Sequence, residues 1–281
     1  MPSVSDVTEL QQAIRDLTVL AAQDVDKLWR LIVDRGLDPV QIRDMLIAAS
    51  PDLVLPYVTA ATQLSAQWYD EQLPDSTFRA ATAALPQAAE LAASATWAAG
   101  PAFAAASGTA TSVSPADLLT GSLQRRIYNG SRETVAMNAD REEGATWARY
   151  ASASACAFCR MLATRGEVYS SKAAATRVVG RGKDASTNFD PRTGKRKSGG
   201  QAKGVRTRGA QKAGDKYHDH CHCMAVPVRP GDSYAPPSYV DEWQQQYLDA
   251  VRATSSKEKY GAIDTKAVLA HMDKASRESR D

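Results

Sequence analysis

Four cysteines form two close pairs that are far apart in the sequence. Cys156 and Cys159 make a C-x-x-C turn, and Cys221 and Cys223 follow much later among histidines. A C-x-x-C turn can place two sulfurs on one metal ion, and zinc prefers tetrahedral sets of thiolate and imidazole ligands. If the second pair is extended, its two sulfurs lie on one side because side chains alternate along a strand. The spacing therefore predicts a metal site.

The predicted ligand set is Cys156 and Cys159 with two residues of a second cluster. That cluster contains His218, His220, Cys221 and Cys223. Thiolates alone can fill all four positions, and neither an H-E-x-x-H motif nor an H-x-E motif near the C-x-x-C is present. We therefore expect a structural zinc ion, one per chain, rather than a catalytic one. Buried or free thiols with incidental histidines, or a disulfide-bonded pair, remain alternatives.

Three functions of other classes compete with a structural site. Asp219-His220 before a cysteine resembles the Asp-His of HNH or treble-clef nucleases, in which His220 would be the general base and His222 or His218 would bind a catalytic metal. No Asn/His pair on a clear ββα pattern follows Cys223, which argues against a nuclease. A Cys–His hydrolase would use Cys159 or Cys221 as nucleophile. A zinc-ribbon adaptor for nucleic acid is the third alternative, and the primary expectation is that the chain is not an enzyme.

Helical signals fill the N-terminal half of the chain. Apolar residues at three- and four-residue spacing predict a helix over 7–35, which Gly36 ends. Asp38-Pro39 predicts the start of a short helix through about Ala49, and Ser50-Pro51 repeats that signal. The second of these helices is expected to break at Leu73-Pro74-Asp75.

Alanine dominates residues 80–110 and predicts a further helix, because alanine is the strongest helix former. Gly100-Pro101 should interrupt this helix, and 107–114 is expected to be a loop. Ser114-Pro115 then opens another helix that fades near Gly144.

Strand signals begin after this helical part. Residues 146–150 and 224–228 predict short strands, and 167–169 could form another. Ser238 with Asp241 suggests a capping box for a helix that carries Trp243, Tyr247 and Val251 on one face. We expect the last twenty or so residues to be weakly ordered.

A basic, glycine-containing segment separates the two cysteine pairs. Basic residues far outnumber acidic ones over 181–216, and large apolar residues are nearly absent. This composition predicts a solvated, mobile loop. The loop could contact DNA by neutralising phosphates without reading sequence. The candidate DNA-binding residues are Arg192, Lys195, Arg196, Lys197, Lys203, Arg206 and Arg208.

Together these patterns predict a mainly α N-terminal module and a small α+β zinc-stapled C-terminal module. The expected ranges are 1–143 for the helical, alanine-rich assembly module, 144–230 for the zinc module with its loop, and 231–281 for a C-terminal helix and tail. The 281-residue chain is 43% hydrophobic with a formal net charge of +2, as is ordinary for globular proteins. It has no run of about 18 apolar residues, so no transmembrane helix is expected. Its first residues lack the features of a secretory signal.

The cysteine motifs and their order resemble a known family. A helical module precedes Cys156–Cys159, then Arg165-Gly166-Glu167-Val168-Tyr169, then His218-Asp219-His220-Cys221-His222-Cys223 ahead of Pro227. This arrangement resembles the MuF-type minor head proteins of tailed bacteriophages over about 145–230. The run Tyr-His-Asp-His-Cys-His-Cys is similar to members from actinobacterial phages.

The resemblance implies a function in the phage particle. Proteins of this type are minor capsid proteins, which associate with the portal and the capsid interior and enter with scaffold during assembly. The expected partners are therefore portal, scaffold or major capsid protein, with non-specific contact to packaged double-stranded DNA and no membrane. The expected location is the virion interior after assembly in the host cytoplasm, and ejection with the DNA is a further expectation.

Overall fold

The computed structural model describes residues 2–109, 111–164, 221–254 and 264–278. As predicted, these residues are mainly helical, with one sheet of two strands. They divide into two compact units. The helical unit contains Pro2–Asn138 and residues 221–225, and the sheet unit contains the described residues from Ala139 to 164 and from Val226 onward. The division at 1–143, 144–230 and 231–281 stays a prediction.

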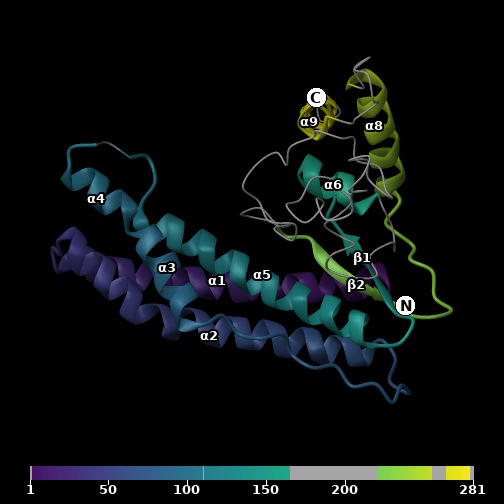
Figure 1. Ribbon diagram of the computed structural model, residues 1–281, viewed down its shortest axis with the longest axis horizontal. Coiled ribbons are helices and arrows are strands. Elements are labelled where there is room, and N and C mark those ends of the chain that lie inside the picture. Colours follow the sequence, from purple (N-terminus) through teal and green to yellow (C-terminus); the bar gives the residue numbers. More distant parts are fainter. Residues whose placement is uncertain (1, 110, 165–220, 255–263, 279–281) are drawn as a thin grey trace, which may run out of the picture. The chain divides into compact units, whose positions relative to one another are not determined.

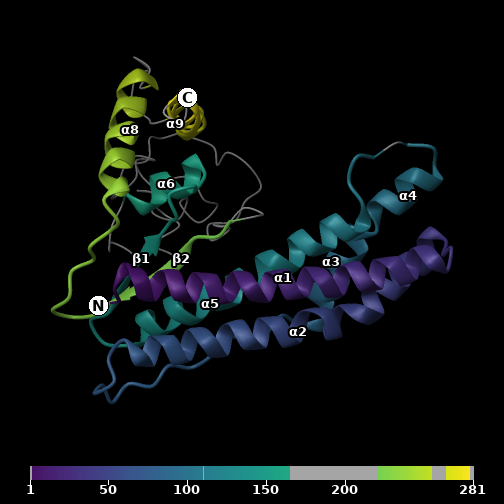
Figure 2. The ribbon, with the colours of Figure 1, turned by 180° about the vertical axis from the view of Figure 1, so that it is seen from behind.

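Three long helices form the body of the helical unit. Helices α1 (Val4–Asp34), α2 (Pro39–Glu71) and α5 (Pro115–Arg141) run alongside one another in both views (Figures 1 and 2). The helix predicted over 7–35 is thus confirmed as α1, and Gly36 ends it with a left-handed φ of 60°. The helix predicted from Ser114-Pro115 is confirmed as α5. Gly130 of α5 has no side chain, which lets α2 pack closely against it. A Cβ added at Gly130 would lie only 3.1 Å from the Val58 side chain.

The helix break predicted at Ser50-Pro51 is wrong. Helix α2 runs without interruption past both Pro51 and Pro56. A proline inside a helix removes one backbone hydrogen bond and costs about 3 kcal/mol. Burial of one face offsets this cost, since apolar residues at four-residue spacing are buried on both sides of Pro51: Ile42, Leu46, Val54 and Val58. Tertiary packing therefore overrides the local signal.

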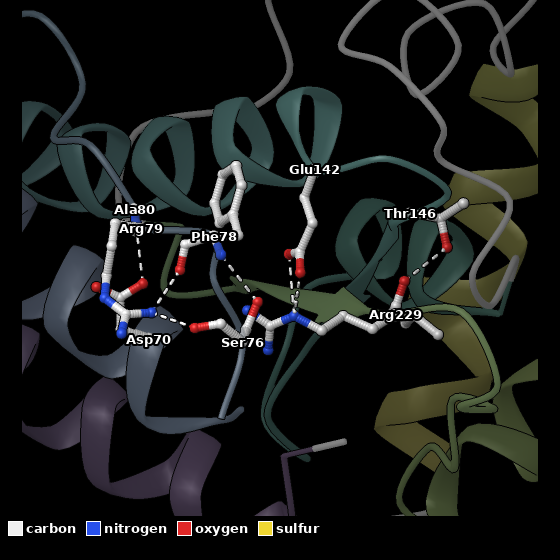
Figure 3. Close-up of polar contacts among 9 residues, drawn as sticks. Asp70, Ser76, Phe78, Arg79, Ala80, Glu142, Thr146 and Arg229 are labelled. Carbon is white, nitrogen blue, oxygen red and sulfur yellow. Dashed lines mark hydrogen bonds and ion pairs between the residues drawn. The ribbon is translucent and has the colours of Figure 1, made fainter. Parts of the chain in front are cut away.

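The prediction that a helix begins at residue 80 is also wrong for the first turns of that helix. Residues 78–87 are not helical, and α3 (Ala88–Ala98) begins only afterwards. Side chains of the long helices bind this segment's backbone. Asp70 accepts a hydrogen bond from the Ala80 amide at 2.9 Å (Figure 3). Asn138 both accepts from the Ala81 amide at 2.9 Å and donates to its carbonyl oxygen at 2.7 Å. Pro86 disfavours helix in the residue before it, and these bonds satisfy the extended backbone.

The predicted interruption at Gly100-Pro101 is confirmed. Helix α3 ends at Ala98, and the short helix α4 (Gly100–Ala106) follows.

Among the described residues, the sheet unit contains one strand, residues 226–228 of a second strand, and three helices. Strands β1 (Thr146–Tyr150) and β2 (Met224–Val228) have the predicted bounds. The helices are α6 (Ala157–Ala163), α8 (Tyr239–Thr254) and α9 (Thr265–Glu278). The helix predicted after Ser238 is confirmed as α8. The weak order expected for the last twenty residues is wrong for residues 264–278, which the structure describes, because α9 buries Val268 and Met272 in a core with α6 and α8.

A tight corner joins the end of α5 to β1. Gly144 has a φ of 75°, which side chains other than glycine rarely adopt. A Cβ built on Gly144 would lie 2.8 Å from Cγ of Pro230. Next to this contact, Nε of Arg229 donates to both carboxylate oxygens of Glu142 at 2.9 Å (Figure 3). The charge pair is nearly buried and fixes the chain that leaves β2 against the chain that enters β1.

Helix α2 is long and apolar enough to cross a membrane by length and composition alone. This is weak evidence, because a core helix of a soluble protein passes the same test. A third of the relevant window, 33%, is buried inside the structure. The expectation that the chain has no transmembrane helix stays a prediction.

Gly144→Ala should destabilise the sheet unit through both backbone strain and overlap with Pro230. We expect a loss of about 1–2 kcal/mol from the left-handed backbone and roughly 1–3 kcal/mol more from the overlap, in the free energy of unfolding. Gly231→Ala is the matched control, because Gly231 has a φ of 87° but no atom within 4 Å of the added Cβ. Denaturant unfolding followed by circular dichroism measures both. Equal losses for the two variants would contradict the close approach of Gly144 and Pro230.

Candidate metal centre

The first cysteine pair lies at the start of α6. Cys156 is the N-cap residue with extended backbone, and Cys159 lies within the helix. Ala157 and Met161, four residues apart, face the apolar core of the sheet unit. Cys159 is two residues from each of them, which places it about 200° around the helix axis. Its thiol therefore points away from that core, although its side chain is buried.

The second pair precedes β2 and alternates with His222. The ring of His222 stacks on Tyr128 of α5, with centroids 5.1 Å apart and an angle of 13° between the planes. The Gln124 side-chain amide hydrogen-bonds to Nε2 of this ring, and Gln11 of α1 donates to the His222 carbonyl oxygen at 2.6 Å. Because neighbouring side chains alternate in extended backbone, a histidine held against α5 leaves both cysteines to point the other way.

Three cysteines come together. The Sγ atoms of Cys159, Cys221 and Cys223 all lie within 4.8 Å of one another. Their side chains are buried, with 1%, 5% and 3% of their surfaces exposed. A tetrahedral thiolate site with metal–sulfur bonds of about 2.3 Å places its sulfurs roughly 3.8 Å apart. No disulfide joins any two of the four cysteines, so the disulfide alternative finds no support. The three cysteines can therefore hold one metal ion.

The surroundings of the second pair combine burial with positive charge. Arg132 of α5 donates from Nε to the Cys223 carbonyl oxygen at 2.6 Å and from Nη2 to that of Cys221. Its guanidinium also lies 5.1 Å from the ring centroid of Tyr128. Burial raises the pKa of Tyr128 to about 12, against the opposing effect of Arg132. The tyrosine therefore stays neutral near pH 7 and adds no negative charge beside the thiols.

The structure places the predicted ligands differently. It gathers Cys159, Cys221 and Cys223, whereas Cys156 is exposed at the N-cap of α6 and is not in the group found among the described residues. His218 and His220 lie outside the described residues, and so does the basic segment 181–216 with all seven candidate DNA-binding residues.

Sequence reasoning missed Arg132 and Tyr128, which contact the second cysteine pair. One signal could have identified Arg132. It lies three residues before the buried Val135 and four after the buried Tyr128, on the apolar face of α5. A charged residue at such a position is informative, because arginine is almost never fully buried without a partner.

The fold and the cysteine group define the chain as a mainly helical protein with a small sheet and a candidate metal centre. The model of the VG15 protein family matches residues 1–250. The chain belongs to this family, and the match indicates a phage or viral gene product. No curated protein and no solved structure matches the chain.

Alkylation of the metal-free protein should separate the four thiols by burial. Cys156 is exposed and should react first, and Cys159, Cys221 and Cys223 should react much more slowly. Mass spectrometry of peptides after timed exposure to iodoacetamide measures each rate, and a denatured sample gives the rate without structure. Equal rates for all four thiols in the folded protein would contradict the buried group.

Proposed function

We propose that this chain is a non-enzymatic minor capsid protein of a tailed phage, stabilised by one structural zinc ion. The match to a viral protein family over residues 1–250 carries the viral part of this proposal. The group of three buried thiols carries the zinc part. The cysteine motifs, which resemble those of MuF-type head proteins, supply the finer assignment to the phage head.

Zinc is the metal that the donor set favours. Thiolates are soft ligands that suit zinc, whereas calcium and magnesium require oxygen ligands. Cys159, Cys221 and Cys223 would supply three ligands, and the fourth would come from Cys156, His218 or His220. Zinc bound in a closed tetrahedral site contributes directly to folding stability.

A structural role is favoured over catalysis for two reasons. The three thiols are buried, whereas a catalytic zinc keeps a coordination position open to water or substrate. The ring of His222, one candidate ligand of a nuclease metal, already stacks on Tyr128 and bonds to Gln124. The nuclease alternative would then depend on His218 and His220.

The helical unit is the part that would bind other head proteins. It exposes large apolar side chains, among them Trp97 with 53% of its surface exposed, Phe103 with 39% and Val33 with 59%. Such side chains are available for burial against portal, scaffold or major capsid protein. Contact of the basic residues in 181–216 with packaged DNA, a place in the capsid interior and ejection with the DNA belong to the same proposal.

Metal analysis of the purified chain should give about one zinc ion per molecule. Cys223→Ser should lose most of this zinc, because it removes a buried ligand. Addition of a chelator should lower the melting temperature of the wild-type chain, because binding to the folded state alone stabilises it. Cys156→Ser is the matched variant. Retention of full zinc by Cys156→Ser would assign the fourth ligand to a histidine, and a zinc-free wild-type chain would contradict the zinc centre.

The protein should be present in purified phage heads at low copy number. Quantitative mass spectrometry of virions and of immature heads tests this, with the major capsid protein as the reference. A phage that lacks the gene should form fewer infectious particles, and the wild-type gene in trans should restore them. Absence of the chain from both kinds of particle would contradict the proposal. Nicking of plasmid DNA by the zinc-loaded chain with Mg²⁺ would instead favour the nuclease.

A further inference from the structure

One arginine of the helical unit holds the backbone of both cysteines in the second pair. Arg132 has only 2% of its surface exposed. Its Nε donates to the Cys223 carbonyl oxygen at 2.6 Å, and its Nη2 donates to the Cys221 carbonyl oxygen. Nη1 donates to the side chain of Asn129 at 3.1 Å. The guanidinium therefore connects α5 to the two residues that each carry a candidate metal ligand.

The shape of a guanidinium suits this task. It presents several N–H donors in a rigid plane, whereas lysine offers a single charged group on a flexible chain. In extended backbone the carbonyl oxygens of residues i and i+2 point the same way, as their side chains do. A planar fork that holds the carbonyl oxygens of Cys221 and Cys223 thus fixes the direction of both thiols.

Contacts to His222 hold the same segment at its middle residue. The imidazole stacks on Tyr128, and Gln11 binds the carbonyl oxygen between the two that Arg132 binds. The hydrogen bonds of Gln11 and Gln124 to His222 are exposed, whereas those of Arg132 are buried. Hydrogen bonds to a charged donor that is buried are stronger than those at the surface. Arg132 is therefore the main constraint on this segment.

The charge of Arg132 also suits a thiolate site. Three thiolates and one divalent ion carry a net charge of −1, and a fourth thiolate would make it −2. Burying such a group is costly without a nearby positive charge. Arg132 binds the backbone carbonyl oxygens of two of the residues that carry these thiols.

We propose that Arg132 is the positioning residue of the metal centre, which holds Cys221 and Cys223 in the geometry that presents both thiols to the ion. This inference rests on the proposed zinc site. It also means that metal affinity depends on a residue of helix α5 that does not itself bind the metal.

The test compares Arg132→Met and Arg132→Lys with Arg126→Met in the full chain. Arg126 is the matched control, because it is a partly buried arginine of the same helix that contacts Glu90 and Ser94 of α3. Zinc affinity is measured by competition with a chromophoric chelator. Arg132→Met should weaken zinc binding by about 10- to 100-fold, as is typical when a residue that orients a ligand is lost. Arg132→Lys should fall between this variant and the wild type, and Arg126→Met should bind as the wild type does.

Two further readouts separate positioning from general stability. The absorption bands of Co²⁺ in the site should shift in Arg132→Met and not in Arg126→Met, because only the former changes thiolate geometry. In the metal-free proteins, alkylation of Cys221 and Cys223 should be faster in Arg132→Met, while the rate for Cys159 changes less. The alkylation readout needs no metal and applies to Arg132→Lys if the methionine variant does not fold.

The outcomes are distinguishable. Wild-type zinc affinity, Co²⁺ spectrum and alkylation rates in a folded Arg132→Met chain would overturn the positioning role and leave the zinc centre intact. A wild-type chain that binds neither zinc nor Co²⁺ would refute the zinc centre itself. In that case, alkylation rates of Cys221 and Cys223 that are the same in Arg132→Met as in the wild type would also refute the proposal that Arg132 fixes the position of these two cysteines.

Discussion

A buried guanidinium that binds the carbonyl oxygens of two residues, separated by a single residue, holds the backbone between them in place. Arg132 does this for Cys221 and Cys223, and the ring of His222 packs on Tyr128 in the same stretch of α5. Alternation along the extended segment then sends both thiols to one side. The gathering of these two thiols with Cys159 within 4.8 Å depends on that arrangement. The candidate metal site takes its ligands from short motifs, yet it relies on a helix that is distant from them in sequence.

Much of the fold follows from local sequence signals. Strands β1 and β2 were predictable to the residue, since β-branched and aromatic residues lie between clear breaks. Helices α1 and α5 follow from their apolar spacing, and Ser114 marks the start of α5, whereas the cap at Ser3 starts α1 earlier than the predicted residue 7. The failures have a common physical cause. Pro51 is accommodated because the buried face of α2 continues past it, and residues 80–87 are extended because Asp70, Thr134 and Asn138 bind their backbone. Such contacts between distant segments leave no local signal.

The sequence indicated which residues could bind a metal, but it did not indicate the residues of α5 that contact them. The spacing of the two cysteine pairs, Cys156 with Cys159 and Cys221 with Cys223, indicated a metal site without any structure. Arg132 and Tyr128 belong to no motif, and only the position of Arg132 on an apolar face marked it as unusual. Cys156, which the C-x-x-C turn also named, lies exposed at the N-cap of α6. Membership of the VG15 protein family supports the viral context that the cysteine motifs indicated only by resemblance.

Zinc-edge X-ray absorption spectroscopy of the purified wild-type chain tests the metal centre most directly, because it reports the ligand atoms around the ion. We expect three or four sulfur ligands at about 2.3 Å, with at most one nitrogen ligand at roughly 2.0–2.1 Å. A first shell made of nitrogen and oxygen ligands, or with a single sulfur, would contradict a centre built on Cys159, Cys221 and Cys223.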